Sequence, residues 1–98
     1  MKAFTFPEIK SQLIDLPGWV LVPDMPAISK TYKFADFNTG LQFVNSVGKL
    51  AETENHHPDI LLTWGKVVVT FWTHTVKGVT NLDFKLAGLV NKVKYEER

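Results

Sequence analysis

The stretch ILLTWGKVVVTFWTH, residues 60–74, decides the fold. We expect a short strand over Ile60–Trp64, a turn at Gly65 and Lys66, and a second strand over Val67–Thr73. Both strand segments are rich in the β-branched and aromatic residues that favour strands. Because a two-residue connection joins antiparallel neighbours, the sheet is predicted to be antiparallel.

The two faces of the second strand carry different chemistry. Successive side chains of a strand point to opposite faces, so Val67, Val69 and Phe71 are expected to face the helices. Trp72 and His74 would then share the other face. A wide aromatic ring beside an imidazole suits a stacking pocket for a flat ring, and we expect Trp72 to form a wall of such a pocket.

Upstream of this hairpin, the sequence predicts one helix and two strands. Proline suits a first helical turn, and apolar residues at helical spacing follow it, which predicts a helix over Pro7–Asp15. A β-rich run over Trp19–Val22 and the alternating segment Ile28–Phe34 predict two strands. A short turn joins these two strands, so they are also expected to pair as antiparallel neighbours.

Two more helices flank the hairpin. Asp36 suits the N-cap of a helix over Phe37–Glu54, in which apolar residues recur at helical spacing. Thr80 and Asp83 match a capping box with Asp in place of the usual Glu, which predicts a final helix to about Lys94. The order is therefore α-β-β-α-β-β-α. We expect an α+β fold, a four-stranded antiparallel sheet with three helices packed on one face.

The composition is that of an ordinary globular domain. The chain has 98 residues, 45% hydrophobic and 21% charged, so we expect a single domain over residues 1–98. It has no cysteine, so disulfides and thiol-based sites are excluded. The net charge is +1 with scattered lysines, and no nucleic-acid-binding face is expected. We recognise no signal peptide or membrane span and expect a cytoplasmic protein.

All three histidines lie at the ends of predicted elements: His56 and His57 follow the long helix, and His74 ends a strand. A zinc site is one interpretation, but the usual ligand spacings are missing, and no serine elbow or triad spacing indicates a nucleophile. General acid–base catalysis is another, because imidazole titrates near neutral pH. Hydrogen bonds that only cap the element ends are the third. The spacing alone does not decide between the last two.

Two carboxylates, of Asp83 and Glu52, occupy notable positions at the ends of predicted helices. Asp83, at the third position of a helix that opens with Thr80, is expected first to cap that helix, although one carboxylate can also orient an imidazole. Glu52 lies near a helix C-terminus, where the helix dipole disfavours negative charge. Its presence there indicates a nearby partner.

The spacing of these residues resembles the signature of the pterin-4a-carbinolamine dehydratases. Gaps of three, five, nine and eight residues separate the members of the pattern, which are Glu52, His56-His57-Pro58, Trp64, His74 and Asp83. The segments YKFADF (32–37) and GVTNLD (78–83) also look like that family. The similarity runs from about Phe4 to Val93, which is essentially the whole chain.

The resemblance implies a fold and an activity. Members share a four-stranded antiparallel sheet with three helices on one face, pair sheet edges into dimers and often stack helices into tetramers. They dehydrate the 4a-hydroxytetrahydropterin that aromatic amino-acid hydroxylases release, in tetrahydrobiopterin recycling, and use no metal or cofactor. Some animal members also serve as dimerisation cofactors for a homeodomain transcription factor. We therefore expect a pterin substrate, a homodimer or homotetramer, and no cofactor.

By position, the resemblance also assigns roles to the residues of the site. It implies that His56 and His74 form the acid–base pair, and that His57 binds and polarises the pterin. Asp83 would orient an imidazole and count with the three histidines as catalytic. The expected substrate-binding residues are Glu52, His57, Trp72 and Thr73. Trp72 is not part of the signature, and its role as a wall of the pocket is expected from strand alternation alone.

The chain also departs from the family pattern. Val76 and Lys77 replace small residues, which would narrow or recharge the rim of the pocket. Gly40 and Gly48 lie in a helix that is commonly alanine-rich, which weakens the case for a tetramer. The alternative to the enzyme is a non-catalytic pterin-binding or protein-dimerisation module on the same fold. Retention of the three histidines and of Asp83 favours the enzyme.

Overall fold

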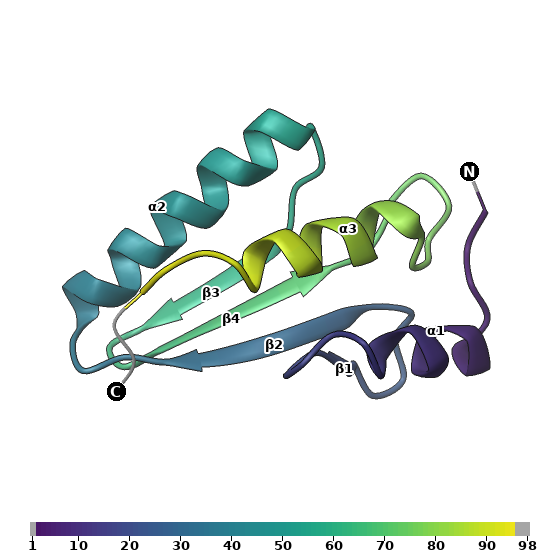
Figure 1. Ribbon diagram of the computed structural model, residues 1–98, viewed down its shortest axis with the longest axis horizontal. Helices are drawn as coiled ribbons and strands as arrows, with labels where there is room; N and C mark the ends of the chain where they lie inside the picture. Colours follow the sequence, from purple (N-terminus) through teal and green to yellow (C-terminus); the bar gives the residue numbers. More distant parts are fainter. Residues whose placement is uncertain (1, 96–98) are drawn as a thin grey trace.

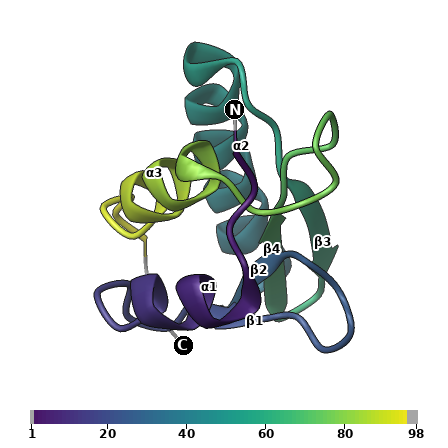
Figure 2. The ribbon, with the colours of Figure 1, turned by 90° about the vertical axis from the view of Figure 1, so that its right-hand side faces the viewer.

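A four-stranded antiparallel sheet with three helices on one side makes up the fold of the computed structural model, which describes residues 2–95 (Figure 1). The elements are α1 (Phe6–Leu13), β1 (Val20–Leu21), β2 (Ile28–Lys33), α2 (Phe37–Glu54), β3 (Asp59–Thr63), β4 (Lys66–Phe71) and α3 (Asn81–Val90). This order confirms the predicted α+β arrangement. Figure 2 shows the helices together on one side of the sheet.

The sheet has the strand order β1-β2-β4-β3, and every neighbouring pair is antiparallel. The long strands β2 and β4 pair along their whole lengths at the centre. The strand β1 is only two residues long, shorter than the predicted Trp19–Val22. Thr63 pairs with Lys66, so the hairpin turn consists of Trp64 and Gly65, one residue earlier than expected. Among residues 2–95, the strand β3 pairs only with β4 and leaves one edge of the sheet open.

The strand that was predicted to reach Thr73 ends at Phe71. Thr73 instead forms an isolated bridge with Gly78, and its N–H donates to the Gly78 carbonyl at 2.8 Å. Between them the chain turns through Lys77, whose φ of 52° is left-handed. His74 therefore lies in a turn, and strand alternation does not set the direction of its side chain.

Two helices begin as local rules require. The helix α2 has the predicted bounds, and the carboxylate of its N-cap, Asp36, accepts the Thr39 N–H at 2.8 Å. Since this bond favours the ionised form, the pKa of Asp36 is lowered. The helix α1 starts slightly before the predicted Pro7, because Thr5 and Glu8 form a capping box.

The helix α3 ends at Val90, one turn before the predicted Lys94. The next N–H groups, of Lys92 and Val93, donate to carbonyls only three residues back, which tightens the chain out of the α-helix. The side chain of Asn91 holds this end in place, since its Oδ1 accepts the Trp19 indole N–H at 2.9 Å.

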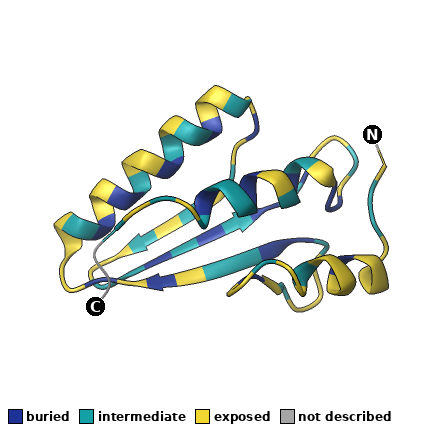
Figure 3. Ribbon diagram, in the orientation of Figure 1, coloured by how far each residue is buried: buried dark blue, intermediate teal, exposed yellow. Residues whose placement is uncertain are grey.

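The core lies between the sheet and the helices, and Figure 3 shows its buried positions on the two central strands and on the inner sides of α2 and α3. Val67, Val69 and Phe71 are fully buried, which confirms the predicted inner face of β4. Each large apolar side chain buried in this way contributes roughly 1.5–3 kcal/mol. Within residues 2–95, no helix has both the length and the apolar character to cross a membrane.

Candidate active site

The C-terminal end of α2 fixes the position of His56. Asn55 caps the helix in the left-handed conformation, with a φ of 52°, and turns the chain sharply. The His56 N–H then donates to the Ala51 carbonyl at 3.1 Å, which satisfies the helix end. The imidazole is directed inward and lies nearly parallel to the Phe71 ring at 6.1 Å between centroids. The way in which α2 ends thus places the imidazole of His56 in the interior.

Asp83 is the centre of a buried hydrogen-bond network. Its Oδ1 lies 2.6 Å from Nε2 of His56, and its Oδ2 accepts the Thr73 hydroxyl at 2.8 Å and the Thr80 N–H at 2.9 Å. The side chain of Asp83 is fully buried. Asp83 also lies in the first turn of α3, at the end of the helix where the dipole favours an acidic side chain.

The donors of this network can be assigned from its geometry. The Thr73 hydroxyl has one hydrogen, which it donates to Asp83, so in the 2.8 Å contact between the two threonine hydroxyls Thr80 is the donor. In the same way, Nε2 of His56 carries the hydrogen that it shares with Asp83. Among residues 2–95, Nδ1 of His56 has no hydrogen-bond partner and is reached by solvent. A neutral His56 therefore presents a proton acceptor outward.

Glu52 and His57 form a second pair at the surface. A carboxylate oxygen of Glu52 contacts Nε2 of His57 across the end of α2. Both side chains are exposed, by 77% and 54%. The partner that the sequence indicated for Glu52 is therefore a neighbouring imidazole.

Trp72 and His74 lie together, as expected, but they stack on each other. Their ring centroids are 4.0 Å apart at an interplanar angle of 29°. The indole N–H of Trp72 donates to Oδ2 of Asp59, the first residue of β3, at 3.2 Å. The two rings are therefore in direct contact, and both side chains line the same cavity.

One cavity brings all three histidines together. It has a volume of about 350 Å³, within the range typical of small-molecule sites. Its lining residues come from the end of α2, the end of β4 with the following turn, and α3. They are Asn55, His56, His57, Trp72, Thr73, His74, Thr75 and Leu82.

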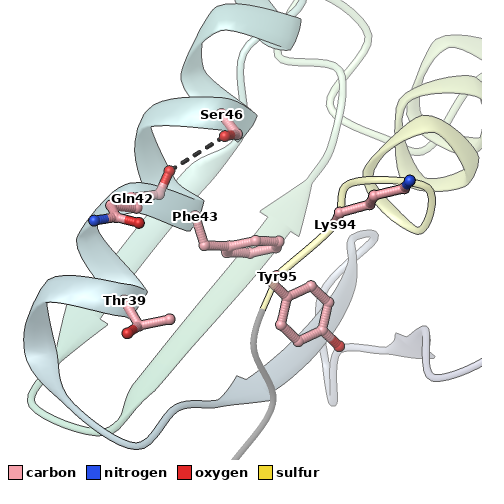
Figure 4. Close-up of a pocket in the computed structure, with 6 residues that line it drawn as sticks. All are labelled: Thr39, Gln42, Phe43, Ser46, Lys94 and Tyr95. Atoms are coloured by element: carbon pink, nitrogen blue, oxygen red, sulfur yellow. Dashed lines mark hydrogen bonds between the residues drawn. The ribbon is translucent and has the colours of Figure 1, made fainter.

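A second cavity lies elsewhere in the fold, between α2 and the C-terminal segment. Its volume is about 600 Å³, and Figure 4 shows that its lining contains Phe43, Tyr95 and Lys94 beside polar side chains of α2. Among residues 2–95, its lining contains neither a histidine nor a carboxylate. It therefore lacks the acid–base groups that the histidine cavity provides.

The arrangement in the histidine cavity suits proton transfer. Two imidazoles, of His56 and His74, can accept or release protons next to a bound molecule, and His57 adds a third at the rim. No three histidine or acidic side chains among residues 2–95 converge closely enough to hold a metal ion.

Two participants were missed at the level of sequence. Thr80 was recognised only as a helix cap, whereas its hydroxyl also supports Thr73 beside Asp83. Asp59 was given no role, although it binds the Trp72 indole. Thr80 carried a usable signal in its capping box. Asp59 carried none, because its partner is 13 residues away and the bond depends on strand register.

Comparison with known proteins identifies relatives over nearly the whole chain. The sequence profile of a family described as "Pterin 4 alpha carbinolamine dehydratase" matches residues 2–93. A Vibrio vulnificus protein named "Putative pterin-4-alpha-carbinolamine dehydratase" is 43% identical over 93 residues, covering 93% of this chain and 84% of that protein. A Hahella chejuensis protein of the same name is 44% identical over 82 residues, covering 82% and 73%.

Solved structures share the fold. A Brucella melitensis protein described as a transcriptional coactivator/pterin dehydratase superposes with a TM-score of 0.86 at 37% identity, over 92% of this chain and 96% of that one. A pterin dehydratase-like protein described as a RuBisCO assembly factor in the alpha-carboxysome superposes with a TM-score of 0.63 at 20% identity, over 76% and 86%. The second likeness shows the fold alone.

Proposed function

This chain belongs to the pterin 4 alpha carbinolamine dehydratase family, and on that premise we propose that it dehydrates 4a-hydroxytetrahydropterin to quinonoid dihydropterin. In this reaction the C4a–O bond breaks and the hydroxyl leaves as water with a proton from an acid. A base removes the proton from N5, and a C4a–N5 double bond forms. The reaction is a proton-balanced elimination without oxidation or reduction, which an acid and a base can carry out.

The buried pair of His56 and Asp83 is the observation that carries the proposal. The 2.6 Å bond directs the Nε2 hydrogen of His56 toward Asp83 and leaves Nδ1 as the acceptor of the ring, and His56 lines the histidine cavity. When His56 takes up a proton, the buried carboxylate stabilises the imidazolium that forms. We therefore assign His56 as the base that removes the N5 proton.

His74 is assigned as the acid on the other side of the same cavity. It is exposed and stacks on Trp72, so it can exchange protons with solvent between turnovers. In its protonated form it donates to the departing hydroxyl.

The remaining residues of the rim are assigned to binding. We propose that His57, held by Glu52, hydrogen-bonds to the pterin and polarises it. Thr73 and Trp72 complete the wall of the cavity beside His74. Because the substrate is a product of aromatic amino-acid hydroxylases, the chain would act after such an enzyme in tetrahydrobiopterin recycling. The absence of cysteine fits a reducing compartment, and we propose a cytoplasmic location.

A homo-oligomer, either a dimer or a tetramer, is the second part of the proposal. The free edge of β3 and an adjoining groove of about 900 Å³ between α2 and β3 support it. Leu61 on the edge strand β3 is an exposed large apolar side chain. A side chain at Gly48 would meet no atom of this chain within 4 Å, which leaves room for a second copy. Sedimentation equilibrium tests this, since a monomer at micromolar concentration would refute it.

A non-catalytic role is the alternative, and the same surface favours it. An open strand edge beside an apolar groove is what a dimerisation or protein-binding module requires. Two structural relatives are themselves described as a transcriptional coactivator and as an assembly factor. The buried pair of His56 and Asp83 distinguishes the two interpretations, because neither residue lines this groove.

A direct assay tests the activity. A phenylalanine hydroxylase generates the 4a-hydroxytetrahydropterin, this protein is added, and the ultraviolet absorbance of the quinonoid product is followed. We expect acceleration well above the spontaneous rate, unchanged by a chelator. Folded protein that gives no acceleration would refute the proposed enzyme and favour the binding module.

A further inference from the structure

Asp59 and Trp72 are joined across two adjacent strands. Asp59 begins β3 and pairs in register with Thr70 of β4, and Trp72 follows the end of β4 by one residue. This register brings the indole N–H to within 3.2 Å of Oδ2 of Asp59. The acceptor is a carboxylate, so the bond is charge-assisted and fixes the orientation of the indole ring.

The face of that indole is occupied by His74. The ring centroids are 4.0 Å apart, which is van der Waals contact. A third flat ring between them would need a gap of roughly 7–8 Å, twice the usual contact distance. In this structure Trp72 therefore serves as a platform for the imidazole, and no substrate ring fits between the two.

His74 has little else to hold it. It lies in the turn between Thr73 and Gly78, and its side chain is at the surface. Among residues 2–95, that side chain makes no hydrogen bond or ion pair, and its ring contact is the stack on Trp72. A surface imidazole without such contact moves among several rotamers. His56 is different, because Asp83 and the Phe71 ring hold it.

We propose that Asp59 and Trp72 are positioning residues that hold the His74 imidazole at the rim of the histidine cavity. Asp59 orients the indole, and the indole orients the imidazole. The importance of this for catalysis rests on the proposed function, in which His74 supplies the proton to the departing hydroxyl. The chain of contacts itself is independent of that function and can be tested separately.

The enzymatic test compares substitutions at Asp59 with a matched control. Asp59→Ala removes the acceptor, and we expect kcat/KM to fall about tenfold, because small displacements of a catalytic group cost that much or more. Asp59→Asn keeps a carbonyl acceptor and is expected to stay within about twofold of the wild type. Asp15→Ala, at an exposed carboxylate in the loop after α1, is the control and should have no effect.

A double substitution separates positioning from general damage. Trp72→Phe keeps an aromatic ring but removes the N–H, so Asp59 loses its partner. Adding Asp59→Ala to Trp72→Phe should then cause no further loss, because the two residues act in series. Independent, multiplying effects would contradict the proposal.

Nuclear magnetic resonance tests the contact without any substrate. In the wild type, the ring protons of His74 are shielded by the indole on which the imidazole lies. Asp59→Ala should move the His74 Hε1 resonance toward the position of an unstacked histidine, and Asp59→Asn should not. A purely structural role for Asp59 would change the melting temperature and leave this resonance unmoved in the folded protein.

The outcomes distinguish this proposal from the proposed function. A wild type that fails to accelerate dehydration refutes the function, whereas the His74 resonance still tests the positioning. Equal resonances and rates in Asp59→Ala and Asp15→Ala would overturn the positioning role. If Asp59→Ala fails to fold, Trp72→Phe carries the test, since it breaks the same bond from the other side.

Discussion

The helices α1 and α3 begin with the same kind of capping box, but the two boxes have different surroundings. In α1, Glu8 accepts the Thr5 N–H at 2.8 Å, and both residues are exposed. In α3, Asp83 accepts the Thr80 N–H at 2.9 Å, and both residues are fully buried. In both boxes the carboxylate accepts the N–H of the threonine, while the threonine hydroxyl accepts the Glu8 N–H in α1 and the Leu82 N–H in α3.

The difference lies in what the rest of the carboxylate does. The cap of α3 uses only Oδ2 of Asp83, and Oδ1 is left to bind His56. Thr73 adds a further donor to the capping oxygen. A local motif thus becomes part of a candidate active site when burial brings other elements to the second oxygen. Glu8 has no such neighbours among residues 2–95 and remains a cap.

Loss of the imidazoles is expected to have the largest effect. In His56→Gln combined with His74→Ala, no acid or base remains on the proposed path, whereas glutamine keeps an N–H donor for Asp83. We expect the dehydration rate to fall at least about a hundredfold, to the spontaneous rate. Initial rates measure this, with circular dichroism as the check that the variant is folded. If this double variant kept the wild-type rate, the imidazole that the α3 capping box holds would have no part in catalysis.

Among the substitutions considered, removal of the Asp83 carboxylate is expected to reduce stability the most. Asp83→Ala leaves His56, Thr73 and the Thr80 N–H without their buried partner, and the free energy of unfolding should fall by about 3–5 kcal/mol. Urea denaturation measures this change. A loss below about 1 kcal/mol would mean that the network contributes no more than an exposed cap.

Thr73→Val is expected to have an effect of intermediate size on stability, and it tests the buried network around Asp83. Valine matches the shape of threonine but cannot donate to Asp83 or accept from Thr80, and we expect a loss of about 1–2 kcal/mol in the free energy of unfolding. Thr53→Val is the control, because that hydroxyl is exposed on α2, and it should change stability by less than about 0.5 kcal/mol. Equal losses in the two variants would contradict a special role for the buried hydroxyl.

Glu8→Gln is expected to have the smallest effect, with no change in the dehydration rate. Hydrogen bonds from the backbone and side chain of Thr5 lower the pKa of Glu8. A pKa that is lower in the folded state means that this carboxylate stabilises the fold above its unfolded pKa, and that the contribution is lost as the pH falls through the folded value.

The melting temperatures of the wild type and Glu8→Gln test this linkage. The wild type should be slightly more stable at pH 7, and the two curves should meet below about pH 3. A difference that persists unchanged in acid would mean that the carboxylate charge of Glu8 has no part in it.

The parts of the fold that depend on local rules were predictable from the sequence. Asp36 and the Thr80–Asp83 box marked helix starts correctly, and alternation along β4 gave the buried face of Val67, Val69 and Phe71. The Thr5–Glu8 box was equally visible as a T-x-x-E pattern but was not used, so the start of α1 was placed too late.

The parts that depend on contacts between distant residues were not predictable in the same way. The bridge between Thr73 and Gly78 ends β4 early and takes His74 out of the strand alternation. The bond between Asp59 and Trp72 depends on strand register, which periodicity does not give. The proximity of His56 and Asp83 was expected only from the resemblance, because 27 residues separate them.

The most direct test compares the two capping carboxylates in one assay. Asp83→Asn and Glu8→Gln each replace a charged cap with its neutral amide, and the dehydration rates of both folded variants are measured beside the wild type. We expect Glu8→Gln to match the wild type and Asp83→Asn to fall at least about a hundredfold, because His56 loses the charge that stabilises its protonated form. Equal rates in the two variants would contradict the claim that the buried box of α3 supports catalysis.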